Sequence, residues 1–293
     1  MFFHGFPSSR LEATFIDATV RRQHLRVITP DRPGFGIFTP QTDRRITDWP
    51  ADVSKLAAHL RLLRFAILGG SGGGPYAVAC ANALPRETMS AIGLLASAPP
   101  WEAGTQHITA TRKVIHGLST NWPGVLCVTS DILVGAVRRA AYSSLGKSLV
   151  SRFLEKSSEA AASAEPDSRK SMHEEPEPEP EPEPSVDEQR DQLLRFLFEG
   201  FAHGSGAFVH EAMLLTHPWG IAFEDVAYDK IQIWHGTEDV NAPISMIRYL
   251  AKRLPSAELR EFKDTHFSVV QHLDAILEEL VPAEEKERWC RRQ

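Results

Sequence analysis

The sequence predicts an α/β protein with a doubly wound, mostly parallel sheet, an inserted helical cap and a disordered Glu-Pro segment. Short apolar runs alternate with helix-like stretches over residues 1–100, and this alternation resumes after residue 227. Between these regions the alternation is missing. Strands that alternate with helices favour a parallel sheet covered on both faces. We therefore expect residues 1–100 and 227–293 to form the core and residues 101–226 to form the cap.

Most of the expected strands are short apolar runs that end near turn residues. A parallel strand that is covered on both faces is apolar throughout and does not alternate. Runs such as FAILGG and KIQIWHG fit this description. The expected strands are residues 1–3, 25–31, 65–70, 89–98, 230–236 and 257–264.

The expected helices are marked by apolar residues at 3.6-residue spacing. Residues 47–63 have Asp48 at the position of an N-cap and one apolar face, formed by Val53, Leu56, Ala57, Leu60 and Leu63. Residues 187–202 of the cap have a second such face, formed by Leu193, Leu194, Leu197, Phe198 and Phe201. Two more helices are expected over residues 243–255 and 266–281.

The net charge of −6 comes from one segment of the sequence. Six glutamates lie in EEPEPEPEPEPS, residues 174–185, and removing them would cancel the net charge. Alternating Glu and Pro cannot form a helix, because proline lacks an N–H, and the segment has no apolar face to bury. We expect residues 155–188 to be a disordered, solvated insert. No basic patch indicates a nucleic-acid partner.

The three cysteines, Cys80, Cys127 and Cys290, are far apart and form no C-x-x-C motif. This spacing argues against a disulfide framework or a zinc site and is typical of a reducing compartment. The first ten residues do not resemble a secretory signal, and no apolar run approaches the roughly 18–20 residues of a membrane span. We expect a cytoplasmic protein that has no metal, no cofactor and no membrane partner.

The glycine-rich stretch GGSGGG, residues 69–74, lies between an expected strand and an expected helix. A phosphate loop would require a lysine after its last glycine, and none follows. A dinucleotide site is suggested by G-x-G-x-x-A at Gly72, Gly74 and Ala77. However, Pro75 removes an N–H from the first helical turn, and the next strand is not followed by the acidic residue that would bind a ribose.

A nucleophile elbow, G-x-S-x-G, fits the same stretch at Gly69, Ser71 and Gly73. The chain reverses so sharply at such an elbow that side chains two residues before and after the nucleophile would collide. Glycine removes those side chains, and the serine is held in a strained conformation with its hydroxyl exposed. Because glycine-rich turns also occur for packing reasons, this interpretation needs further residues.

A serine nucleophile needs a base, and the base needs an orienting acid, in the chain order Ser, Asp, His for this type of elbow. Asp239 and His266 follow the last two expected strands, so the carboxyl ends of parallel strands would bring them to Ser71. Glu238 and Asp264 are alternative acids, and each residue taken singly could be an ordinary cap or surface group.

The oxyanion of such a reaction needs two N–H donors. Gly72, directly after Ser71, would supply one of them, and Phe6 in the turn HGFP after the first strand would supply the other. The alternative for Gly5–Pro7 is a simple turn. Trp101, at the start of the cap, is a candidate substrate contact.

The motifs HGFPSS, PDRPGFG, GGSGGGPYA, WHGTEDVNAP and THFS resemble the ordered motif set of the α/β-hydrolase fold superfamily, in particular its bacterial and fungal members with a helical cap. The resemblance covers residues 1–100 and 210–281. It implies Ser71, Asp239 and His266 as the catalytic triad and Phe6 and Gly72 as oxyanion donors. A serine nucleophile is unlike the haloalkane dehalogenase and epoxide hydrolase branches, which place an aspartate there.

Two departures from the family pattern bear on function. Family members usually have a β-hairpin before the strand that corresponds to residues 1–3, and this sequence does not show one. We therefore expect an unpaired sheet edge, which another copy of the chain could cover in a homo-oligomer. In addition, Thr265 replaces the glycine that often precedes the histidine, and could shift His266.

The function expected from these observations is a serine hydrolase that cleaves an ester or related acyl bond of a small molecule. Alternatives are a catalytically silent or truncated binding protein and other chemistries of the same triad: aminopeptidase, carbon–carbon bond hydrolase, haloperoxidase or lyase.

Overall fold

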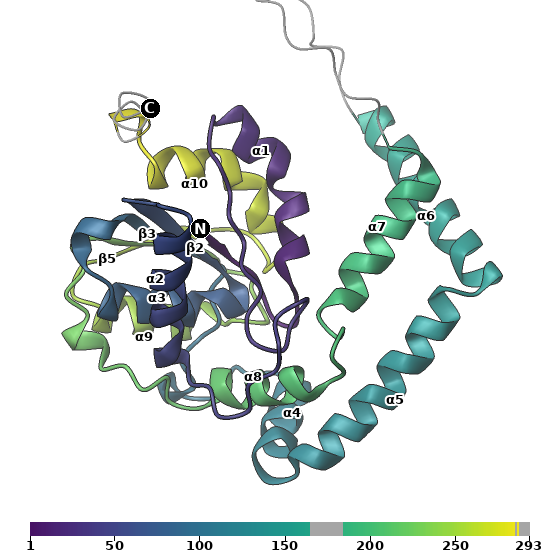
Figure 1. Ribbon diagram of the computed structural model, residues 1–293, viewed down its shortest axis with the longest axis horizontal. Helices are drawn as coiled ribbons and strands as arrows, with labels where there is room; N and C mark the ends of the chain where they lie inside the picture. The colour runs from purple at the N-terminus through teal and green to yellow at the C-terminus, as the bar shows by residue number, and fades with distance from the viewer. Residues whose placement is uncertain (165–183, 285, 287–293) are drawn as a thin grey trace, which may run out of the picture. The chain divides into compact units, whose positions relative to one another are not determined.

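The computed structural model describes residues 1–164, 184–284 and 286 of the chain. Within these residues, five strands form one sheet in the order β1-β2-β3-β4-β5, and every neighbouring pair is parallel (Figure 1). The strands are β1 (Phe2–Phe3), β2 (Phe65–Gly70), β3 (Met89–Leu95), β4 (Ile231–Gly236) and β5 (Ala257–Phe262). The predicted parallel α/β sheet is confirmed.

Helices cover both faces of this sheet. The buried core on one face includes residues of α2 (Trp49–His59), α3 (Gly74–Ala83) and α9 (Ile244–Arg253). The core on the other face includes residues of α1 (Asp17–Arg22) and α10 (Leu273–Leu280). These two layers on opposite faces give the doubly wound arrangement that the alternation of strands and helices predicts.

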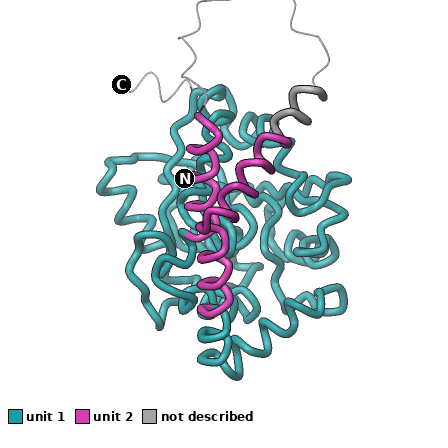
Figure 2. Tube along the Cα trace, turned by 90° about the vertical axis from the view of Figure 1, so that its right-hand side faces the viewer, with its two compact units in different colours: residues 1–130, 199–293 teal, residues 131–198 magenta. Residues whose placement is uncertain are grey.

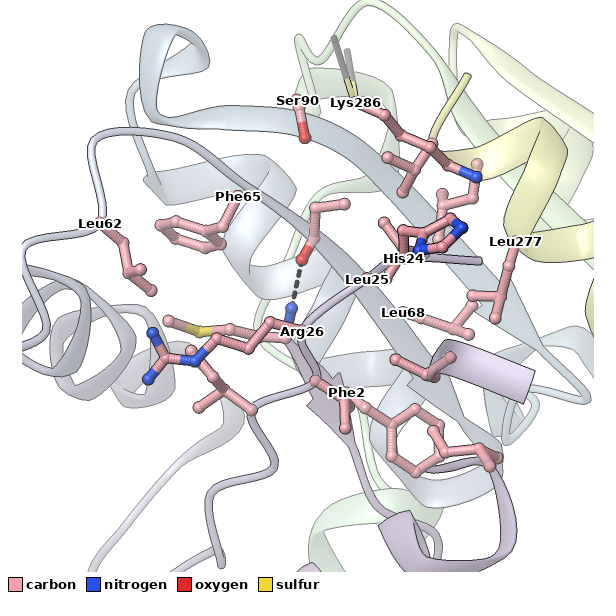
Figure 3. Close-up of a pocket in the computed structure, with 18 of the residues that line it drawn as sticks. Phe2, His24, Leu25, Arg26, Leu62, Phe65, Leu68, Ser90, Leu277 and Lys286 are labelled. Atoms are coloured by element: carbon pink, nitrogen blue, oxygen red, sulfur yellow. Dashed lines mark hydrogen bonds between the residues drawn. The ribbon is translucent and has the colours of Figure 1, made fainter. Parts of the chain in front are cut away.

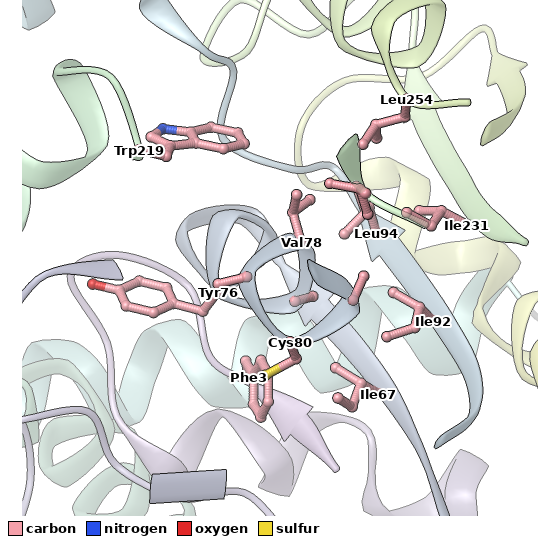
Figure 4. Close-up of a cluster of buried hydrophobic side chains, with 14 of the residues drawn as sticks. Phe3, Ile67, Tyr76, Val78, Cys80, Ile92, Leu94, Trp219, Ile231 and Leu254 are labelled. Atoms are coloured by element: carbon pink, nitrogen blue, oxygen red, sulfur yellow. The ribbon is translucent and has the colours of Figure 1, made fainter. Parts of the chain in front are cut away.

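Successive strand residues alternate between the two cores, because neighbouring side chains of a strand point to opposite faces. In β2, Ile67 belongs to the core with α3, and Leu68 belongs to the core with α10. In β4, Ile233 and Trp234 divide in the same way. Figure 4 shows the larger core, where β-strand residues such as Ile67 gather around the side chains of α3. This burial fixes the register of the strands that lead to the candidate site.

The expected strand at residues 25–31 is wrong for the described structure, which assigns no strand there. One backbone hydrogen bond, from Phe2 N–H to the Ile28 carbonyl at 2.9 Å, links this segment to β1. β1 has two residues, so it offers few ladder positions, and the segment stays irregular.

The described residues between β3 and β4 are mostly helical. Its helices are α4 (Ala110–Asn121), α5 (Pro123–Ala141), α6 (Ser144–Ala164), α7 (Val186–Glu199) and α8 (Gly206–Thr216). The chain divides into two compact units, shown in Figure 2: residues 1–130 with 199–293, and residues 131–198. α4 and α8 therefore belong to the unit that contains the sheet. The second unit, residues 131–198, is shorter than the cap expected over residues 101–226.

The predicted disordered insert, residues 155–188, is wrong at both of its ends. α6 continues to Ala164 and α7 begins at Val186. The alanine-rich sequence EAAASA before residue 165 favours a helix, because alanine has the highest helix propensity. Residues 165–183, which include most of the Glu-Pro repeat, lie outside the described residues.

The expected helix at residues 47–63 is shorter than predicted and begins differently. A 3₁₀ turn (Ile46–Asp48) precedes α2, and the Asp48 carboxylate accepts from Arg45 N–H at 2.8 Å instead of capping α2. The helix ends at His59, and Arg61 takes a left-handed conformation with a φ of 55°. Leu63 therefore leaves the apolar face and is 76% exposed.

Among the described residues, no helix is both long enough and apolar enough to cross a membrane.

Candidate active site

The turn after β2 has the shape of a nucleophile elbow. Ser71 directly follows β2 and has a φ of 47°, a left-handed conformation that is strained for a residue with a side chain. A Cβ at Gly69 would lie 2.6 Å from the Gly73 carbonyl oxygen, and one at Gly73 would lie 2.2 Å from that of Phe3. Both glycines are therefore required by close backbone contacts. α3 begins three residues after Ser71, which points its N-terminal N–H groups at the same site.

The three residues proposed as a triad lie in one hydrogen-bonded chain. The Ser71 hydroxyl oxygen is 2.9 Å from Nε2 of His266, and Nδ1 of His266 is 2.7 Å from Oδ2 of Asp239. Asp239 follows β4 and His266 follows β5, at the same edge of the sheet as Ser71. In this arrangement an imidazole can take the hydroxyl proton while a carboxylate holds its tautomer.

Asp239 is buried and is held by several donors. Its Oδ1 accepts from the N–H groups of Asn241 and Ala242, each at 2.8 Å. Burial by itself would raise the pKa of Asp239, but hydrogen bonds from His235 and His266 outweigh it and hold this pKa well below the usual carboxyl value. The carboxylate thus stays charged, as a group that orients an imidazole must.

The alternative acids lie elsewhere. Asp264 is bound by Ser268 and Gln271, each at 2.7 Å, and by His272 at 2.8 Å. Glu238 is exposed. Thr265 N–H donates to the Ser268 hydroxyl at 2.9 Å, and with Thr265 in this turn His266 still reaches Ser71. Thr265 therefore does not move His266 out of hydrogen-bonding distance of Ser71.

The two expected oxyanion donors are adjacent. A Cβ added to Gly72 would lie 2.5 Å from Cβ of Phe6 and 3.0 Å from its backbone nitrogen. The Phe6 ring stacks on Phe208 of α8, with centroids 5.3 Å apart and planes 6° apart. This packing keeps Phe6 next to the elbow.

Trp101 lies in a separate cluster in the described structure. It is buried with Ile108 and Met246, and its ring centroid is 4.6 Å from that of His116. None of these described contacts involves the triad. A role for Trp101 in substrate binding stays a prediction.

Three charged or polar residues at this site do not follow from the elbow pattern. His235 Nε2 lies 3.3 Å from Oδ2 of Asp239 and 2.7 Å from the Ala242 carbonyl oxygen. Glu12 accepts from Gly5 N–H at 2.7 Å, and Arg32 donates to the carbonyl of Gly5 at 2.9 Å. The signal in the sequence was weak: a histidine inside a strand, a glutamate three residues after HGFPSS and an arginine within PDRPGFG.

A cavity of about 650 Å³ lies away from these residues. Figure 3 shows that it is lined mainly by apolar side chains, including Phe2, Leu68 and Leu277. None of the triad residues lines it, so we do not assign the chemistry to this cavity. Within the described part of the chain, no group of three or more His, Cys, Asp or Glu side chains is placed to hold a metal ion.

A parallel sheet that presents a serine elbow, with a histidine and an aspartate after its later strands, defines the α/β-hydrolase class. The chain belongs to the Alpha/beta hydrolase family, whose model matches residues 1–279. Comparison with curated protein sequences gives no match.

Solved structures with this fold include proteins of different chemistry. An enol-lactonase from Burkholderia xenovorans has 16% identity and a TM-score of 0.56, over 96% of this chain and 88% of that protein. An esterase from Exiguobacterium antarcticum has 14% identity and a TM-score of 0.57, over 96% and 89%. A bromoperoxidase from Bacillus anthracis has 14% identity and a TM-score of 0.54, over 95% and 87%. At these identities the likeness shows the fold alone.

Proposed function

We propose that this protein is a serine hydrolase that cleaves an ester or related acyl bond of a small molecule. The observation that carries the proposal is the continuous chain from Ser71 through His266 to Asp239, with contacts of 2.9 and 2.7 Å. Family membership and the esterase and lactonase among the similar structures support a hydrolase.

In the proposed reaction, the Ser71 hydroxyl attacks the acyl carbon while His266 takes its proton. The tetrahedral oxyanion accepts hydrogen bonds from the backbone N–H groups of Phe6 and Gly72. His266 then gives the proton to the oxygen of the leaving alcohol as the ester C–O bond breaks, and the acyl group stays on Ser71. Water, activated by the same imidazole, releases the acid and restores the serine. Asp239 keeps Nδ1 of His266 protonated, so that Nε2 faces Ser71 as a base.

Labelling with a fluorophosphonate probe tests this proposal, because the probe reacts with an activated serine. We expect the native protein to be labelled at Ser71 and to hydrolyse short-chain nitrophenyl esters. The Ser71→Ala variant should do neither, with an unchanged circular dichroism spectrum. A folded native protein that is neither labelled nor active would contradict the proposal.

A series of acyl chain lengths, together with amide substrates, would define the substrate class. Preferential cleavage of aminoacyl amides would indicate an aminopeptidase instead of an esterase. The widely spaced cysteines support a cytoplasmic location, which cell fractionation would test.

A further inference from the structure

The backbone of Gly5, one residue before the proposed oxyanion donor Phe6, is held on two sides by charged side chains. Its N–H donates to Oε2 of Glu12 at 2.7 Å. Its carbonyl accepts from Nη2 of Arg32 at 2.9 Å, and Nη1 of Arg32 donates to the His4 carbonyl at 2.6 Å. Charge-assisted hydrogen bonds of this kind are about twice as strong as neutral ones.

These contacts determine where the Phe6 N–H points. In a planar trans peptide, the carbonyl of one residue and the N–H of the next point in opposite directions. Because the Gly5 carbonyl points at Arg32, the Phe6 N–H points away from Arg32. Gly72, the other proposed donor, lies close to the backbone nitrogen of Phe6. Glycine itself has wide conformational freedom, so the orientation of this peptide depends on its hydrogen-bond partners.

Glu12 lies beside the elbow as well as beside Gly5. It belongs to a 3₁₀ turn (Arg10–Phe15), where its N–H donates to the Ser9 carbonyl at 3.0 Å. A Cβ added to Gly5 would lie 3.3 Å from the Glu12 carboxylate and 3.5 Å from Cβ of Ser71. A Cβ added to Gly70 would lie 3.7 Å from the same carboxylate. The carboxylate therefore occupies the space between the HGFP turn and the elbow.

The Glu12 carboxyl group lies in a partly buried position and needs hydrogen-bond donors there. Burial raises the pKa of Glu12 above the ordinary carboxyl value. Hydrogen bonds from Gly5 and Ser8, and then the charges of Arg32 and His266, act against this rise. A buried carboxyl group is retained at little cost only where donors satisfy it. The Gly5 N–H is one donor that satisfies the Glu12 carboxylate.

We propose that Glu12 is a positioning residue of the oxyanion hole, which holds Gly5 from the side opposite Arg32 and so directs the Phe6 N–H at the reacting oxygen. The inference rests on the proposed function, because it concerns the same reaction. Glu12 acts through Gly5 and Phe6, and need not touch the substrate.

The experiment compares Glu12→Ala with Glu12→Gln, using the ester that the native protein hydrolyses best. Glu12→Ala removes the acceptor, and we expect kcat to fall about 10- to 100-fold, somewhat less than the loss of a whole oxyanion donor, with KM changed less than about threefold. Glu12→Gln keeps a carbonyl oxygen in the same place, so kcat should stay within about fivefold of the native value. Glu87→Ala, at an exposed glutamate in the turn that precedes β3, is the matched control.

A transition-state analogue separates positioning from general stability. An alkylboronic acid that bonds to Ser71 places an oxygen in the oxyanion hole. Its Ki should rise in Glu12→Ala by about the same factor by which kcat/KM falls, since both report transition-state binding. If Glu12→Ala proves too unstable to assay, Glu12→Asp, which withdraws the acceptor by one methylene, should show the same parallel loss.

Three results would overturn the inference. The first is a native kcat in a folded Glu12→Ala variant, or in Glu12→Asp if Glu12→Ala does not fold. The second is an equal loss of kcat in Glu12→Ala and Glu12→Gln, and the third is a Ki that does not change in parallel with kcat/KM. Each presumes an active native protein. An inactive native protein would instead count against the proposed function, so the two failures are distinguishable.

Discussion

Nδ1 of His266 lies 2.7 Å from Oδ2 of Asp239, across 27 positions of sequence. For this contact to form, β4 and β5 must end at neighbouring positions, so that the loops that follow them lie close together. β4 and β5 are paired in parallel register up to Gly236 and Phe262, which places the loops that follow them side by side. The contact is therefore a product of the sheet register.

Replacing the proposed orienting acid should abolish most of the activity. In Asp239→Asn the amide can no longer hold Nδ1 of His266 protonated, so the imidazole presents the wrong tautomer to Ser71. We expect kcat to fall by about 10⁴-fold, measured with a nitrophenyl ester. Glu238→Gln, at the exposed neighbouring acid, should retain native kcat. The reverse pattern would identify Glu238 as the acid.

The same residue should stabilise the folded protein near neutral pH and should lose this effect in acid. The pKa of Asp239 in the folded protein lies below its ordinary value of 3.8, so the unfolded chain takes up a proton before the folded one does. The stability that this difference contributes is complete above the unfolded pKa and is lost as the pH falls toward the folded pKa. Urea denaturation at pH 5, 4 and 3 should show a steeper loss for the native protein than for Asp239→Asn. Parallel losses would contradict this.

Gly73 should tolerate no side chain. Its Cβ would lie 2.2 Å from the Phe3 carbonyl oxygen, where two pieces of backbone meet. We expect Gly73→Ala to cost at least about 3 kcal/mol of the free energy of unfolding, since packing clashes cost about 1–3 kcal/mol even where side chains can yield. Gly117→Ala is the control, because nothing beyond its own chain neighbours and the nearby backbone of its helix lies within 4 Å of its Cβ position. This variant, in α4, should be neutral or more stable by up to about 1 kcal/mol. Urea denaturation of both variants measures the contrast.

The buried ion pair of Arg32 and Glu211 should be essential to the fold. The two side chains are 1% and 4% exposed, and Nη2 of Arg32 donates to Oε1 of Glu211 at 2.5 Å. Burial opposes the charge of Arg32, but Glu211 raises the pKa of Arg32 above its usual value. Glu211→Ala leaves the buried guanidinium without its carboxylate partner, so we expect a loss of about 3–5 kcal/mol in denaturant unfolding.

The exposed pair of Lys230 and Glu258 provides the comparison for this prediction. Exposed ion pairs contribute little to stability, so Glu258→Ala should leave the unfolding midpoint nearly unchanged. A Glu211→Ala variant as stable as Glu258→Ala would mean that Arg32 finds another partner.

Local patterns in the sequence were sufficient for the sheet, the elbow and the order Ser71, Asp239, His266. They failed at two segments, one of which depends on a distant strand and the other on a nearby turn. Residues 25–31 have the composition of a strand, yet β1 provides too few ladder positions for them. Leu63 continues the helical apolar pattern, but the turn at Arg61 places it in solvent.

What the sequence determined by itself is what short spacings encode: strands from apolar runs, a sharp turn from Gly69 and Gly73, and the residue types of the proposed triad. These depend on the conformations of a few neighbouring residues. What only the tertiary structure decided is which charged groups meet. Asp239 rather than Asp264 reaches His266, and Glu12 and Arg32 meet at Gly5. Such contacts join segments far apart in the chain, and packing around the sheet brings them together.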